Sequence, residues 1–84
     1  MNKEITVNVK LFSHARYHFG KEQITLVLPE GATIKDVIGA IRAEGGPDFG
    51  SVPFRLARNQ KFASEEEPVN AADELACIPP VQGG

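Results

Sequence analysis

The stretch ELACIPPVQGG at residues 74–84 decides the fold of this chain. Residues 74–78 form an apolar run that predicts a strand, and two prolines end it because proline lacks a backbone N–H and fixes φ. Two glycines then close the sequence, and a chain without Cβ atoms can enter a channel too narrow for any other residue. We predict a packed domain over residues 1–78 and an extended, flexible tail over residues 79–84 that presents a terminal carboxylate.

The predicted last strand is apolar on both faces. Alternation along a strand places Leu75 and Cys77 on one face and Ala76 and Ile78 on the other. One face can join the core. The other face is expected to stay uncovered, because the rest of the chain offers only one substantial helix. An exposed apolar patch of this kind predicts a protein partner.

The first half of the chain predicts two strands separated by a short helix. Apolar and polar residues alternate over residues 5–11 and again over 24–28, as in strands with one buried face. Between them, a short helix is expected over residues 15–19, with Ser13 as its N-cap and Gly20 as its end.

A longer helix is predicted to follow. Thr33 is a good N-cap, and Asp36 stands where a capping box places its acidic residue. Glycines and a proline at 45–47 end the helix. Gly39 weakens it by about 1 kcal/mol relative to alanine, and we expect this glycine to allow close packing on the sheet. The apolar residues at helical spacing are Ile34, Val37, Ile38 and Ile41.

The second half predicts short strands and loops. A loop at 48–53 precedes a strand at 54–58, which a turn leads back into a strand at 61–63. An exposed acidic loop at 64–68 separates these from the last strand. This order predicts an α+β fold with a mixed sheet covered on one face by one main helix. With the last strand beside the first, that is a β-grasp, or ubiquitin-like, fold.

Composition excludes several classes of function. The chain has 84 residues, enough for one small domain, and a net charge of −2, which disfavours nucleic-acid and anionic-membrane partners. Cys77 is the only cysteine, so an internal disulfide cannot form. The polar N-terminus does not resemble a signal peptide, and no apolar run approaches the roughly 20 residues that span a bilayer. We expect a cytoplasmic protein.

Few residues before the tail suggest chemistry. His14 and His18 share a helix face, but no third metal ligand lies near them in sequence, so surface histidines are favoured over a metal site. Cys77 lies inside a strand and is expected to be a small buried hydrophobe rather than a nucleophile. We predict no catalytic residue and no metal on this chain. A flexible, unhindered carboxylate on such a domain indicates a carrier, because a carboxylate becomes reactive only after another enzyme activates it.

Three segments of the sequence resemble one family. Residues 73–84 resemble the family's Asp-Glu-Val-Ala, Pro-Pro-Val and Gly-Gly ending. Residues 12–20 resemble its Phe-x-x-Ala-Arg-Glu-x-x-Gly segment, with Tyr17 in place of the glutamate. Residues 57–60 resemble its Ala-Val-Asn-Gln hairpin. The family is the small subunit of molybdopterin synthase, or molybdopterin-converting factor subunit 1, among the ThiS/MoaD-type ubiquitin-like sulfur carriers.

The resemblance implies a role for each part of the tail. A ubiquitin-activating-type adenylyltransferase would adenylylate Gly84, which would then become a thiocarboxylate, with no bound cofactor. The tail would enter the large catalytic subunit, in a heterotetramer of two large and two small subunits, and donate sulfur for the molybdopterin dithiolene. The tail residues expected to enter that active site are Pro80, Val81, Gln82 and Gly83. The residues expected to contact the partner are Phe54, Leu56, Phe62, Ala76 and Ile78.

Other functions stay open. The chain could carry sulfur for another pathway, such as thiamine-thiazole synthesis or tRNA thiolation. It could also be a ubiquitin-like modifier whose Gly84 becomes amide-linked to lysines of target proteins, or an interaction module whose Gly-Gly ending has no chemical role. The Pro-Pro-Val segment favours the small subunit of molybdopterin synthase over these alternatives, because it occurs together with the two internal motifs.

Overall fold

The computed structural model describes residues 3–50 and 52–80. This part of the chain contains two helices and five strands. In chain order they are β1 (Glu4–Leu11), α1 (Ser13–Phe19), β2 (Gln23–Pro29), α2 (Ile34–Gly45), β3 (Arg55–Arg58), β4 (Lys61–Phe62) and β5 (Leu75–Ile78). Neither helix of this part is long and apolar enough to cross a membrane.

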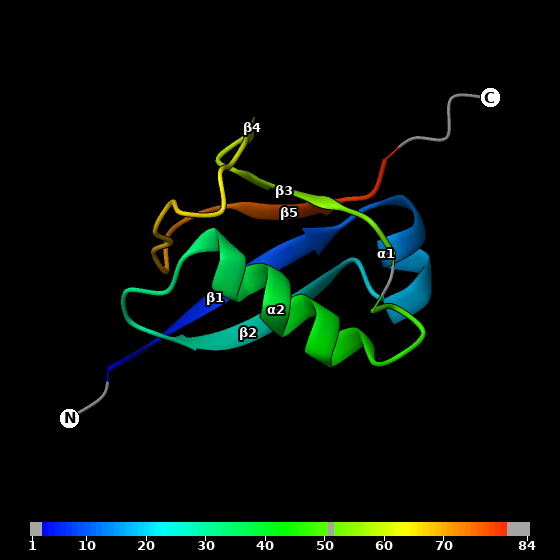
Figure 1. Ribbon diagram of the computed structural model, residues 1–84, viewed down its shortest axis with the longest axis horizontal. Helices are drawn as coiled ribbons and strands as arrows, with labels where there is room; N and C mark the ends of the chain where they lie inside the picture. Colours follow the sequence, from blue (N-terminus) through cyan, green and yellow to red (C-terminus); the bar gives the residue numbers. More distant parts are fainter. Residues whose placement is uncertain (1–2, 51, 81–84) are drawn as a thin grey trace.

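The strands form one mixed sheet in the order β2-β1-β5-β3-β4. The neighbours β1 and β5 run parallel, and every other pair in the sheet is antiparallel. A parallel pair needs a long crossover, and the chain between β1 and β5 supplies it through α2. Figure 1 shows α2 lying across one face of the sheet and α1 at one end of it. The predicted α+β, β-grasp architecture is confirmed, with the last strand beside the first.

The core lies between α2 and the sheet. The helix buries the side chains of Ile34, Val37 and Ile41, which lie on one face because of their helical spacing. The predicted N-terminal cap of this helix is confirmed, because the Asp36 carboxylate accepts the backbone N–H of Thr33 at 2.9 Å. Alternate residues of the strands complete the core, namely Val7, Val9, Leu11, Ile24, Leu26, Leu28, Leu56, Leu75 and Cys77.

The described residues between α2 and β3 form a loop, as predicted, and this loop contributes Phe49 to the core. This side chain is fully buried and packs against the rings of Phe19, at 5.2 Å between centroids, and Phe54, at 5.7 Å. The His18 ring stacks on Phe49 at 4.9 Å. Arg42 holds the segment in place by donating hydrogen bonds of 2.9 and 3.0 Å to two of its carbonyl groups.

Two local predictions about the helices are wrong. Ser13 does not cap α1; it is the first residue of the helix, its φ is +53°, and the N-cap position falls on Phe12 without a side-chain hydrogen bond. Gly39 does not mediate close packing, because a Cβ at this position would meet nothing within 4 Å. The predicted end of α1 is confirmed: Gly20 adopts a φ of +67°, and its N–H donates to the carbonyl of Arg16 at 2.9 Å.

Candidate functional site

The tail leaves the domain at the end of β5. The sequence pattern assigns both prolines to the tail, but Pro79 is fully buried against the domain and Pro80 is exposed. In Figure 1, residues 79 and 80 (red) continue past β5 and lead away from the sheet. The point where the extended chain becomes accessible is therefore Pro80. The other predicted tail residues, Val81, Gln82, Gly83 and Gly84, lie outside the residues that the structure describes.

The face of the sheet opposite α2 carries a groove close to this exit. Strand pairing places Ala76 of β5 next to Ala57 of β3, and Ala57 next to Phe62 of β4. The short side chains of Ala57 and Ala76 thus form the floor of the groove, beside the larger side chain of Phe62. The groove has a volume of about 320 Å³. We call it the outer-face groove, and it is lined by Lys10, Phe12, Ala57, Gln60, Phe62, Glu74, Ala76 and Ile78.

A second hollow continues this surface to the tail. It has a volume of about 280 Å³, and we call it the tail-root hollow. It shares Phe62 and Ile78 with the outer-face groove, and among its described lining residues only Arg55 is not apolar. Among the residues that the structure describes, it is lined by Pro53, Phe54, Arg55, Phe62, Ile78, Pro79 and Pro80. Together the two hollows form an apolar surface that ends where the tail emerges.

Leu56 does not belong to this surface, so its predicted place at the partner interface is wrong. It pairs with Cys77 across the sheet and is only 2% exposed, in the core beneath α2. The reason is the two-residue period of a strand, which sends Leu56 and its neighbours to opposite faces. The other predicted contact residues line one or both hollows, although Phe54 also packs on the core. Those residues are Phe54, Phe62, Ala76 and Ile78.

Phe12, Ala57 and Arg55 are among the residues of this surface that sequence reasoning missed. Phe12 is 46% exposed and lines the outer-face groove, while Ala57 lies in its floor and Arg55 lines the tail-root hollow. The sequence did contain a signal for the positions of Ala57 and Arg55. A two-residue turn at 59–60 pairs residue 57 with Phe62, and strand alternation then places Arg55 on the same face.

A network of charged residues holds the strands that carry the groove. Arg58 lies 2.9 Å from Glu67 and 3.5 Å from Asp73. A hydrogen bond from the backbone N–H of Ser64, followed by one from Arg58, lowers the pKa of Glu67. Burial acts to raise the pKa of Asp73, but hydrogen bonds from a backbone N–H and from the Asn59 amide, with the charge of Arg58, lower it overall. Both carboxylates therefore stabilise the folded chain in their ionised form.

His18 and Cys77, two side chains of the domain that could have taken part in chemistry, have structural roles instead. The Nε2 atom of His18 lies 2.8 Å from the carbonyl oxygen of Gly45, so this histidine joins α1 to the end of α2. Cys77 is fully buried, as predicted, and this burial raises the pKa of its thiol to about 12. Within residues 3–50 and 52–80, no three histidine, cysteine, aspartate or glutamate side chains gather in a way that could hold a metal ion.

Comparison with known families agrees with this architecture. The model of the ThiS family matches residues 9–84, which run from within β1 to the last glycine. The chain belongs to the ThiS family. It is thus a ubiquitin-like sulfur carrier of the ThiS type, as its resemblance to the small subunit of molybdopterin synthase implies.

Relatives of this ThiS-family chain match it over nearly its whole length. The molybdopterin synthase sulfur carrier subunit of Arabidopsis thaliana is 31% identical over an alignment of 97 positions, which covers 100% of both chains. The crystal structure of SAMP1 from Haloferax volcanii has a TM-score of 0.80 at 28% identity and covers 94% of this chain and 99% of its own. A Pyrococcus furiosus structure described as molybdopterin converting factor subunit 1 has a TM-score of 0.81 at 26% identity, covering 92% and 99%.

Proposed function

We propose that this chain is the sulfur-carrying small subunit of a molybdopterin synthase. The observation that carries the proposal is the full-length similarity to a molybdopterin synthase sulfur carrier subunit, at 31% identity. The structure adds physical support, because an apolar surface leads to the exposed Pro80 from which the Gly-Gly ending extends. Gly84 is the residue proposed to carry sulfur, as a C-terminal thiocarboxylate.

The proposed chemistry begins with activation of the Gly84 carboxylate by a ubiquitin-activating-type adenylyltransferase. The carboxylate oxygen attacks the α-phosphorus of ATP, so that an acyl-adenylate forms and pyrophosphate leaves. Hydrosulfide then attacks the carbonyl carbon and loses its proton, and AMP departs with the electron pair of the broken C–O bond. Gly84 thus becomes a thiocarboxylate, and the absence of a side chain at Gly83 leaves the carbonyl carbon open to attack.

The second half of the proposal is delivery to a large catalytic subunit. The tail, from Pro80 through Gly83, would extend into its active site, while the outer-face groove docks on its surface. There the thiocarboxylate sulfur would attack a carbon of a pterin precursor and displace an oxygen substituent, which leaves with the electron pair of the broken C–O bond. Water would then hydrolyse the resulting thioester, which leaves the sulfur on the precursor and restores the Gly84 carboxylate. We propose that two small and two large subunits assemble into a heterotetramer.

Mass spectrometry tests the sulfur-carrier role directly. The chain is expressed with its native last residue, together with its adenylyltransferase and a sulfur donor, and its intact mass is measured. We expect the increase that replacement of one oxygen by sulfur produces. A variant that lacks Gly84 should show no such change and should keep the wild-type unfolding midpoint, because the core residues that the structure describes all precede Pro80. A wild-type chain that stays unmodified under these conditions contradicts the proposal.

A second candidate function is that of a protein modifier. The Haloferax volcanii neighbour is SAMP1, described as a small archaeal modifier protein, and its fold matches with a TM-score of 0.80. In that role the activated Gly84 carbonyl would form an amide with a lysine of a target protein. Conjugates that resist thiols and denaturant, with Gly84 joined to a lysine in tryptic peptides, would favour this role.

Carriers for thiamine-thiazole synthesis or tRNA thiolation would show the same thiocarboxylate but would not restore molybdopterin synthesis.

A further inference from the structure

Arg55 is placed where the apolar surface meets the tail. Its strand partner is Ile78, the last residue of β5, and it lines the tail-root hollow together with Pro79 and Pro80. Its side chain is exposed. A protein that covers the tail-root hollow and receives the tail would therefore lie against Arg55.

The guanidinium of Arg55 is held in a defined position. Its Cζ atom lies 4.1 Å from the centroid of the Phe62 ring, a distance typical of a cation–π contact. Because the planar group is already stacked on an aromatic ring, it loses less conformational freedom when it forms hydrogen bonds to a partner. A flexible lysine at this position would not have this advantage.

The charge of Arg55 is uncompensated within the described part of the chain. The other charged residues of the two hollows, Lys10 and Glu74, lie 3.6 Å apart and offset each other. No carboxylate of residues 3–50 or 52–80 forms a salt bridge with Arg55. The surface around the tail root is thus locally positive on a chain whose net charge is −2. A carboxylate of the partner would complement it, and a basic group would be repelled.

We infer that Arg55 is a specificity-determining residue that pairs with a carboxylate of the large subunit, beside the apolar residues that cover Phe62 and Ile78. This inference rests on the proposed function. Apolar contact over the outer-face groove supplies area but little orientation, whereas one charged pair at the tail root fixes how the two proteins align. The pair therefore selects the partner and aligns the tail with the entrance to its active site.

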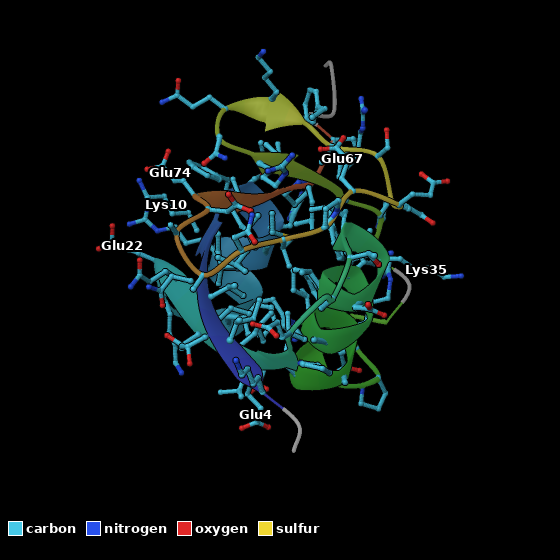
Figure 2. The ribbon with its side chains drawn as sticks, turned by 90° about the vertical axis from the view of Figure 1, so that its left-hand side faces the viewer. Glu4, Lys10, Glu22, Lys35, Glu67 and Glu74 are labelled. Atoms are coloured by element: carbon cyan, nitrogen blue, oxygen red, sulfur yellow. The ribbon has the colours of Figure 1, made fainter. Side chains whose placement is uncertain are left out.

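Binding measurements on four chains test this inference. The wild type, Arg55→Gln and Arg55→Glu are titrated with the large molybdopterin synthase subunit of the same organism over a range of salt concentrations. Lys35→Gln is the matched control, because it removes the same charge from α2 on the opposite side of the sheet from Lys10 and Glu74 (Figure 2). Thermal unfolding of each variant confirms folding, and intact mass reports the thiocarboxylate.

A role in selection predicts a graded result. Arg55→Gln should raise Kd about tenfold at low salt and make Kd nearly independent of salt, and Arg55→Glu should raise it about a hundredfold. Lys35→Gln should bind as the wild type does.

Contrary results would have distinct meanings. If Arg55→Gln binds with the wild-type Kd and the wild-type salt dependence, the inference is overturned. If this variant still forms the thiocarboxylate as the wild type does, the carrier role is unaffected. Slower thiocarboxylate formation in Arg55→Glu with unchanged Kd would assign Arg55 to the adenylyltransferase instead and would also overturn it. A wild-type chain that carries sulfur but does not bind the large subunit would contradict both proposals.

Discussion

The guanidinium of Arg58 lies 2.9 Å from the carboxylate of Glu67, and this contact joins β3 to the segment that follows β4. The same guanidinium reaches Asp73, two residues before β5, at 3.5 Å. One cation thus contacts two points of the segment between β4 and β5. Ala57 in the groove floor precedes Arg58 in β3, so the ion pairs anchor the strand that carries part of this floor.

The lowered pKa of Glu67 predicts a specific dependence of stability on pH. A carboxyl group whose pKa is lower in the folded chain than in the unfolded chain stabilises the fold at pH values above the unfolded pKa, which is about 4.3 for glutamate. This stabilisation is lost as the pH falls through the pKa of the folded chain. Glu67→Gln should therefore be less stable than the wild type at neutral pH, and the difference should shrink below about pH 4. Urea unfolding from pH 7 to pH 3 measures it.

Glu66→Gln is the control for this series, because the neighbouring Glu66 is exposed. It should differ little from the wild type at any pH in the range. A stability difference for Glu67→Gln that stays constant down to pH 3 would show that its carboxylate charge does not contribute.

Two glycines of α2 should respond in opposite directions to the same substitution. Gly39→Ala should stabilise the chain by about 0.5–1 kcal/mol, because alanine restricts the unfolded chain and its Cβ meets nothing within 4 Å. Gly45→Ala should destabilise it by about 1–3 kcal/mol, because its Cβ would lie 2.6 Å from the Cβ of the buried Phe49. Chemical denaturation of both variants gives the two signs. An equal effect of both substitutions would contradict the packing of Phe49 against the helix end.

Leu56 and Phe62 should separate stability from partner binding. Leu56→Ala should lower the free energy of unfolding by about 2–4 kcal/mol, because it opens a cavity beneath α2. Phe62 is 54% exposed, so Phe62→Ser should change stability by less than about 1 kcal/mol. It should nevertheless raise Kd for the large subunit at least about tenfold. The reverse pattern, in which Phe62→Ser unfolds the chain and Leu56→Ala only weakens binding, would invert the assignment of the two faces.

Cys77 should be inert in the folded protein. With a pKa of about 12, only about one thiol in ten thousand is ionised at pH 8, and the side chain is fully buried as well. Iodoacetamide should therefore modify Cys77 only as fast as the protein unfolds. Mass spectrometry with and without denaturant measures the two rates. Rapid modification under native conditions would mean that β5 opens far more readily than its central position in the sheet suggests.

Much of the fold could be predicted because its signals are local. The alternation over β1 and β2, the Thr33–Asp36 cap and the glycine after α1 all depend on residues a few positions apart. The role of Phe49 could not be predicted, because its segment has no periodic pattern. Its ring packs against side chains that the sequence does not show to be close, namely His18 and Phe19 of α1 and Phe54 just before β3. Leu56 was misplaced for a related reason. An apolar residue in a short strand can face either side until its pairing partner is known.

The sequence by itself determined the order and type of the main elements, the two-faced apolar last strand and the Pro-Pro and Gly-Gly ending that indicates a carrier. Periodicity, caps and glycine positions are properties of short segments, so they can be read without the fold. Only the tertiary structure decided which residues share the outer face. The register of β3 and β5 places Arg55 beside Ile78, and that of β3 and β4 brings Phe62 next to Ala57. Register depends on contacts between segments far apart in the chain, and these contacts placed a charged residue where the tail begins.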